Sequence, residues 1–96
     1  MSDNRFLIHR SAFLAHSTLT PRERGALETV LGPLVGLPEE RWPTAGAVRL
    51  DSAEPLYLLR VDDSLRAIVR PAAGGRPELL DLVRHETLER FFKGVG

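Results

Sequence analysis

The segment that most constrains the architecture of this chain is Leu56-Tyr57-Leu58-Leu59-Arg60-Val61-Asp62-Asp63-Ser64-Leu65-Arg66-Ala67-Ile68-Val69-Arg70. It consists of two apolar runs, each of which carries arginine, joined by a short acidic segment. Short runs rich in β-branched and other apolar residues, bounded by turn residues, are typical of β-strands. The segment therefore predicts an antiparallel hairpin.

The register of this hairpin follows from the pleat of the strands. With a three-residue turn over Asp62–Ser64, Val61 pairs with Leu65 and Arg60 lies opposite Arg66. A two-residue turn would move Arg66 onto the apolar face, because a slip of one residue turns every side chain over. The three-residue turn gives an apolar face of Tyr57, Leu59, Val61, Leu65, Ala67 and Val69. The opposite face carries Leu56, Leu58, Arg60, Arg66, Ile68 and Arg70.

Two arginines that face each other across a hairpin repel unless an anion lies between them. The anion could belong to the protein, supplied by Asp62, Asp81 or Glu78. It could equally be the phosphate of a ligand, because the planar guanidinium group binds phosphate and carboxylate with two parallel hydrogen bonds.

Upstream of the hairpin the chain predicts one strand and two helices. Arg5–Arg10 alternates imperfectly around Ile8 and suits a short strand, and Ser11 can cap a short helix that runs to Ala15. Thr20-Pro21-Arg22-Glu23 is a capping box with proline at the first helical position, which predicts a helix that starts at residue 21. Its expected buried stripe is Leu27, Val30, Leu31, Leu34 and Val35.

This second helix is expected to be interrupted at Gly32-Pro33, because proline removes a backbone hydrogen bond. A loop over Gly36–Gly46 follows, in which Trp42 either covers the edge of the core or offers its ring to a base. Strands are predicted at Ala47–Asp51 and Glu78–Arg84 in addition to the hairpin.

Together these elements predict the α+β class: an N-terminal strand, two helices and a strand meander forming a small antiparallel sheet. A short C-terminal helix is expected through Leu88, Phe91 and Phe92.

Length and composition indicate one ordinary globular domain over residues 1–96. Hydrophobic residues make up 43% and charged residues 27%, and the lack of cysteine excludes a disulfide framework. There is no apolar stretch of roughly 18 residues, and Met1-Ser2-Asp3-Asn4 does not resemble a signal peptide. We therefore expect a cytoplasmic protein with no membrane role. The net charge is zero, and every basic residue except Lys93 is arginine.

Two segments of the chain resemble a known family. The run Pro55-Leu56-Tyr57-Leu58-Leu59-Arg60-Val61-Asp62-Asp63-Ser64-Leu65-Arg66-Ala67-Ile68-Val69 resembles the central hairpin of the RelE/ParE superfamily of bacterial toxins, where an arginine, a polar turn and a second arginine recur. Leu80-Asp81-Leu82-Val83-Arg84-His85-Glu86 is similar to the last strand of that superfamily and the polar residues after it. The order of elements also fits, which implies a RelE-like domain.

The resemblance implies the toxin of a toxin-antitoxin pair, in many members an endoribonuclease that cuts mRNA, often on the ribosome, without metal or cofactor. Such chemistry needs a base, an acid and cations for the charge on phosphorus. By motif position Arg66 matches the family's phosphate-binding arginine. His85 is the implied acid or base, because a histidine with the unperturbed pKa of about 6.5 populates both protonation states near neutral pH, and Glu86 is its implied partner. The implied substrate-binding residues are Arg49, Arg60 and Arg84.

Other functions of the same fold stay open. Phe91 or Phe92 stands where many family nucleases have a tyrosine, and His9 and His16 lack metal-ligand spacing. The alternatives are a ParE-like toxin that inhibits a protein such as DNA gyrase, and a non-toxic module that only binds a partner. All of them predict a cognate antitoxin that covers apolar grooves and places carboxylates on the arginines.

Overall fold

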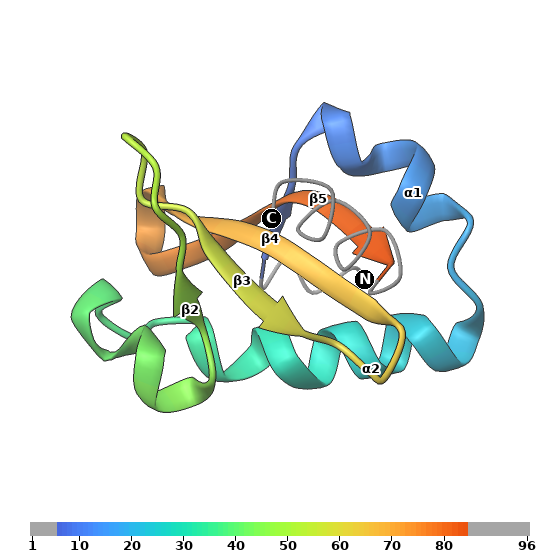
Figure 1. Ribbon diagram of the computed structural model, residues 1–96, viewed down its shortest axis with the longest axis horizontal. Coiled ribbons are helices and arrows are strands. Elements are labelled where there is room, and N and C mark those ends of the chain that lie inside the picture. The colour runs from blue at the N-terminus through green and yellow to red at the C-terminus, as the bar shows by residue number, and fades with distance from the viewer. Residues whose placement is uncertain (1–5, 85–96) are drawn as a thin grey trace, which may run out of the picture.

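The computed structural model describes residues 6–84, and a five-stranded sheet with the spatial order β1-β5-β4-β3-β2 runs through this part of the chain (Figure 1). β1 is parallel to β5, and every other neighbouring pair is antiparallel. The predicted α+β class is confirmed, although the sheet is mixed rather than wholly antiparallel because β1 joins it beside the last strand. The strands are β1 Leu7–Ile8, β2 Val48–Arg49, β3 Tyr57–Arg60, β4 Leu65–Ala72 and β5 Arg76–Arg84.

The β3–β4 hairpin has the register predicted from the pleat. Arg60 lies directly opposite Arg66, and the Val61 amide donates to the Leu65 carbonyl across 2.9 Å. The face expected to be apolar is buried against the core along its whole length, whereas the opposite face is only partly covered. The side chains of the buried face are Tyr57, Leu59, Val61, Leu65, Ala67 and Val69.

A β-bulge adjusts the pairing of β5 with β4. Ile68 pairs with Asp81 and Val69 with Leu79, so that Leu80 has no opposite residue. The extra residue changes which face the following side chains occupy. Because of it, the apolar Leu79 and Leu82 both pack on the core side, while Asp81 between them lies exposed on the other face.

Two α-helices form where the sequence predicts them: α1 Phe13–Ser17 and α2 Pro21–Leu31. Thr20 and Glu23 form the complete capping box at the start of α2, and a 3-10 turn over Gly32–Leu34 follows the helix at the predicted interruption. The cap assigned to Ser11 is wrong. Its hydroxyl donates to the Leu80 carbonyl across 2.7 Å, which links the entry to α1 with the bulge in β5.

The segment predicted as a loop after α2 contains a 3-10 helix, Glu39–Ala45. Trp42 lies on it with only 2% of its surface exposed. Its indole N–H donates to the Leu37 carbonyl across 3.1 Å, and its ring meets Tyr57 edge to face with centroids 5.0 Å apart. Trp42 therefore covers the core and does not offer its ring to a base.

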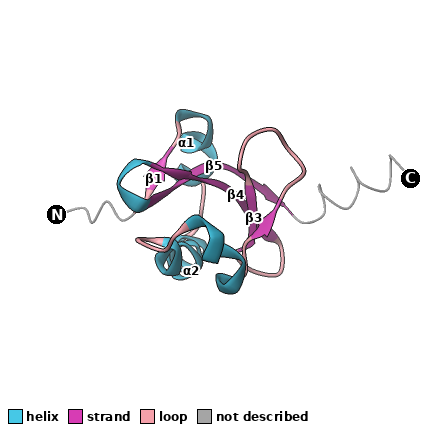
Figure 2. Cartoon of the chain, turned by 90° about the vertical axis from the view of Figure 1, so that its left-hand side faces the viewer, coloured by secondary structure: helices cyan, strands magenta, loops and turns pink. Residues whose placement is uncertain are grey.

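The core lies between the sheet and α2, where Leu27, Leu31 and Leu34 are fully buried. Figure 2 shows the sheet with α2 on one side and α1, beside β1 and β5, on the other. We call the sheet face turned toward α2 the core face, and the face that carries Arg60 and Arg66 the outer face. Across residues 6–84, no helix has the length and apolar character needed to cross a membrane.

Candidate functional site

Two arginines stand side by side on the outer face at the closed end of the β3–β4 hairpin. The hairpin register fixes Arg60 as the last residue of β3 and Arg66 as the second residue of β4. Directly opposite residues on antiparallel strands have Cβ atoms only about 4.5–5.5 Å apart. The two arginine side chains therefore leave the sheet at adjacent positions on the same face.

The turn between the strands supplies acceptors to both arginines. Arg60 Nη2 donates to a carboxylate oxygen of Asp63. Arg66 Nη1 donates to the carbonyl oxygen of Asp62 across 2.6 Å. It also donates to the carbonyl oxygen of Leu65, the residue before it, across 3.2 Å. Protein groups thus lie against both arginines, as expected if the anion belongs to the protein. The carboxylate against Arg60 is that of Asp63, which was not among the three expected.

The three carboxylates predicted as counter-anions have other partners. Asp62 Oδ1 accepts the backbone N–H groups of Ser64 and Leu65, each across 2.8 Å. These hydrogen bonds, the one from Ser64 first, lower the pKa of Asp62 below its usual range. Asp81 accepts the N–H of Leu82 across 2.8 Å, and Glu78 pairs with Arg70.

Arg70 marks the neutral end of the outer face. Its Nε lies 2.8 Å from Glu78 Oε1, on the opposite strand, and its Nη1 lies 3.6 Å from Glu54 Oε2. The hydrogen bond to Glu78 raises the pKa of Arg70. The positive charge of Arg70 is therefore compensated by two carboxylates.

Arg49 and Arg84 do not join this pair. Arg49 is opposite Tyr57, and its guanidinium carbon lies 5.8 Å from the centre of that ring. Arg84 is opposite Leu65. Because Tyr57 and Leu65 belong to the core face, the sheet separates both predicted substrate-binding arginines from the outer-face pair.

Each of these two arginines is held by the protein itself. Arg49 Nη1 donates to the carbonyls of Leu50 and Glu54, each across 3.0 Å. Arg84 Nη1 donates to Glu23 Oε2 across 2.8 Å. That hydrogen bond lowers the pKa of Glu23 and raises that of Arg84.

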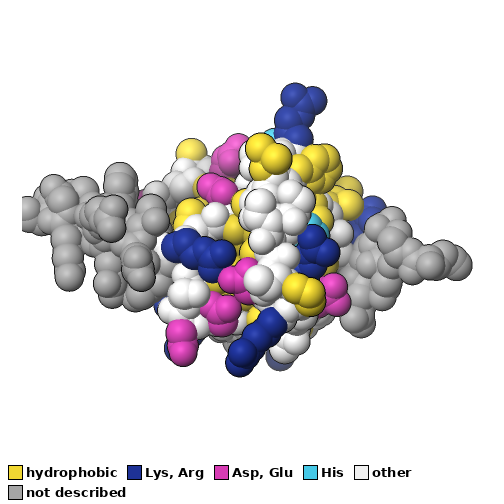
Figure 3. All heavy atoms as spheres, turned by 90° about the vertical axis from the view of Figure 1, so that its right-hand side faces the viewer, with side chains coloured by type: hydrophobic (Ala, Val, Ile, Leu, Met, Phe, Trp, Pro, Cys, Tyr) yellow, Lys and Arg dark blue, Asp and Glu magenta, His cyan; other side chains and the backbone are white. Residues whose placement is uncertain are grey.

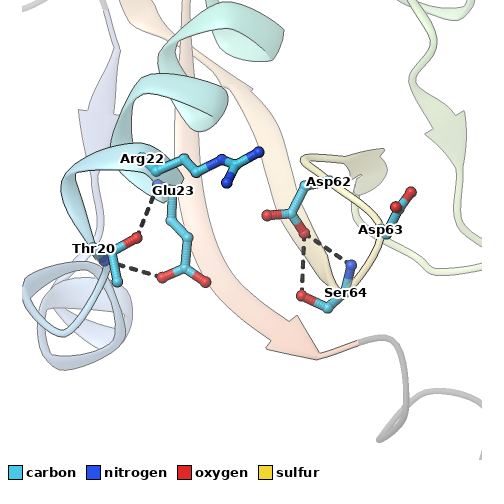
Figure 4. Close-up of a pocket in the computed structure, with 6 residues that line it drawn as sticks. All are labelled: Thr20, Arg22, Glu23, Asp62, Asp63 and Ser64. Atoms are coloured by element: carbon cyan, nitrogen blue, oxygen red, sulfur yellow. Dashed lines mark hydrogen bonds between the residues drawn. The ribbon is translucent and has the colours of Figure 1, made fainter.

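A pocket of about 350 Å³ opens at the same end of the molecule, between the start of α2 and the hairpin turn. Figure 4 shows Arg22 reaching from α2 toward Asp62 across this gap. Figure 3, which views that end of the molecule, shows basic and acidic side chains interspersed over the surface. The pocket itself is mainly acidic, because Glu23, Asp62 and Asp63 face a single basic residue, Arg22, among its lining residues. The lining residues are Thr20, Arg22, Glu23, Asp62, Asp63 and Ser64.

Sequence reasoning placed Asp63 in the hairpin turn and Glu23 in the capping box, but missed the contacts that these residues make with Arg60 and Arg84. Asp63 stands three residues after Arg60, a spacing that brings the two side chains together in a tight turn, so a local signal existed. Glu23 is 61 positions from Arg84, and no local sequence pattern predicts a contact over that separation.

Several predictions fall on residues outside those that the structure describes. His85 and Glu86, the implied acid or base and its partner, and the C-terminal helix through Phe91 and Phe92 all lie beyond residue 84.

For residues 6–84, no group of three or more His, Cys, Asp or Glu side chains is arranged to hold a metal ion. His9 Nδ1 lies 2.9 Å from the Ser11 hydroxyl, and partial burial lowers the pKa of His16.

Comparisons of the chain with known protein families, with curated proteins and with solved structures found no match. The RelE/ParE resemblance therefore rests on the residues quoted above.

Proposed function

We propose that this protein is the toxin of a bacterial toxin-antitoxin pair and that it binds and cuts mRNA as an endoribonuclease. The observation that carries the proposal is the placement of Arg60 and Arg66 opposite each other on the outer face of the hairpin. Two arginines at directly opposite positions of paired strands would offer one guanidinium group to each non-bridging oxygen of a phosphodiester. The family resemblance supports the same position for the phosphate.

The proposed reaction uses the substrate's own hydroxyl. The 2'-oxygen attacks the adjacent phosphorus while the bond from phosphorus to the 5'-oxygen breaks. A base takes the proton of the 2'-hydroxyl, and an acid gives a proton to the leaving 5'-oxygen. The products are a 2',3'-cyclic phosphate and a free 5'-hydroxyl.

Arg60 and Arg66 would act on the charge that builds on the phosphoryl oxygens. Fixed cations aimed at developing charge lower the barrier because they need no reorganisation during the reaction, and one such donor is typically worth about a hundred- to a thousandfold in rate. His85 and Glu86 stay the proposed proton-transfer residues on the basis of the sequence alone. Arg49 and Arg84 are not included, since both lie on the core face.

The proposed antitoxin would silence the protein at the same place. A carboxylate side chain from a partner can occupy the position that phosphate would take, because guanidinium binds both groups with the same geometry. Within the chain itself, Arg60 Nη2 already contacts one carboxylate oxygen of Asp63.

Inducible expression in a bacterial host tests the proposal. The wild type should arrest growth and shorten transcripts, and co-expression of its proposed antitoxin should restore growth. Arg66→Ala should lower both effects by a hundredfold or more, as estimated above. Arg41→Ala, an exposed arginine on the 3-10 helix Glu39–Ala45, is the matched control. Equal toxicity of the Arg66 and Arg41 variants would reject the proposed site.

A toxin that acts by binding a protein is the second candidate. It is favoured by the engagement of Arg49 with Tyr57 and two carbonyls and of Arg84 with Glu23, which leaves a small cationic surface for RNA. Such a toxin, for example one acting on DNA gyrase, would induce the DNA-damage response while transcripts stay intact. A module without toxicity would leave growth unchanged.

A further inference from the structure

We infer that Asp63 is a built-in competing anion, which occupies Arg60 in the free protein and must leave when a phosphate or carboxylate ligand binds. The inference rests on the anion-binding role proposed for Arg60 and Arg66, and it adds a residue that sets how tightly that site binds. It concerns Asp63 alone among the acidic residues of the turn.

The two neighbouring aspartates of the turn have different contacts. Asp62 accepts the N–H groups of Ser64 and Leu65 and so holds the turn closed. Asp63 directs its carboxylate to Arg60, and its side chain is 95% exposed. Asp63 can therefore rotate away from Arg60 without breaking the hydrogen bonds that maintain the turn.

The carboxylate of Asp63 and the oxygens of a phosphodiester require the same donor. A guanidinium group presents its N–H groups in one plane, and both anions bind along its edge. Two arginines that face each other across the strands also repel when nothing neutralises them. Asp63 thus stabilises the free hairpin and, for the same reason, opposes the binding of an external anion.

The size of the effect follows from the exposure of the pair. The Arg60 side chain is 66% exposed, and exposed ion pairs shift an equilibrium by about two- to fivefold. We therefore expect removal of the carboxylate to tighten phosphate binding by about two- to fivefold. A ligand with several phosphates would displace Asp63 more readily than a single ion.

The test is a titration with inorganic phosphate at constant ionic strength, followed by the Nε–Hε signals of Arg60 and Arg66 in NMR spectra. Asp63→Asn and Asp63→Ser should each lower the phosphate midpoint by about two- to fivefold. Asp51→Asn removes the same charge before β3 instead of after it, and should change the midpoint less. In an Arg60→Ala background, Asp63→Asn should leave unchanged the phosphate midpoint that the Arg66 signal reports.

Three results would overturn the inference: an unchanged midpoint in both Asp63 variants, an equal change in Asp51→Asn, or no response of Arg60 to phosphate in any variant. The amide signals of Ser64 and Leu65 report whether the turn is intact in each variant. Failure of the proposed function is visible separately, because Arg66→Ala would then keep full toxicity while the Asp63 variants still bind phosphate more tightly.

Discussion

Arg84, the last residue of β5, donates a hydrogen bond to Glu23 in the first turn of α2 across 2.8 Å, although the two residues are 61 positions apart. The other carboxylate oxygen of Glu23 accepts the N–H of Thr20 across 3.0 Å. One glutamate therefore caps a helix and fixes the end of the last strand against it. This contact places Arg84 in the framework of the fold, on the face away from Arg60 and Arg66.

The Glu23–Arg84 contact should make the free energy of unfolding depend on pH in the acid range. The contact lowers the pKa of Glu23 in the folded protein, so its stabilising effect is present above the unfolded pKa and is lost as pH falls through the folded value. Arg84→Ala should thus destabilise the protein at pH 7, and the difference from wild type should shrink as pH drops below about 4.3. Urea unfolding at several pH values measures this. A difference that stays constant down to pH 2 would contradict the assignment.

The two aspartates of the hairpin turn should differ in their effect on stability. Asp62→Ala removes the acceptor of two backbone N–H groups and should cost about 1–2 kcal/mol in the free energy of unfolding. Asp63→Ala breaks only an exposed ion pair and should cost less than Asp62→Ala, at most about 1 kcal/mol. Denaturant unfolding of both variants checks the order. The reverse order would mean that Asp63 holds the turn.

The start of α2 should respond to loss of its cap. Thr20 Oγ1 accepts the Glu23 N–H across 3.1 Å, and removal of a capping hydroxyl costs about 0.5–2 kcal/mol. Thr20→Ala should show that loss, whereas Thr20→Ser keeps the hydroxyl and should stay near wild type. Thermal unfolding followed by circular dichroism compares the two. Equal losses of stability in Thr20→Ala and Thr20→Ser would mean that the threonine methyl group, and not the capping hydroxyl, is responsible.

The contact between Trp42 and Tyr57 should contribute strongly to the core. Trp42 is 2% exposed and packs edge to face on Tyr57, so Trp42→Ala should cost about 3–5 kcal/mol. Tyr57→Phe removes only the hydrogen bond to Glu39, which spans 2.9 Å, and should cost about 1 kcal/mol. Equilibrium unfolding of both variants gives the comparison. A Trp42→Ala loss below that of Tyr57→Phe would show that the indole ring is not part of the core.

The local features of this fold could be predicted because short-range chemistry determines them. Alternation along the hairpin gave the Arg60–Arg66 register, since only the three-residue turn keeps Arg66 off the apolar face. The Thr20 and Glu23 side chains located the start of α2, and Gly32-Pro33 located its end. Each of these inferences depends on residues within a few positions of one another.

The features that were missed depend on distant partners. The parallel pairing of β1 with β5, the bulge at Leu80 and the contact between Glu23 and Arg84 all join segments far apart in the sequence. Side-chain type alone does not say which face of a sheet a residue occupies, so the sequence does not separate Arg49 and Arg84 from the arginine pair. That face depends on strand pairing, which the structure supplies.

The central claim is that the outer face around Arg60 and Arg66 binds the phosphate backbone of RNA. The most direct test is an NMR titration of the protein with a short single-stranded RNA at low and high salt. We expect the largest shifts on outer-face residues, including the Arg60 and Arg66 side chains, little change at Arg49 and Arg84 on the core face, and weaker binding at high salt. Shifts centred on Arg49 and Arg84, or none at Arg60 and Arg66 at saturating RNA, would contradict it.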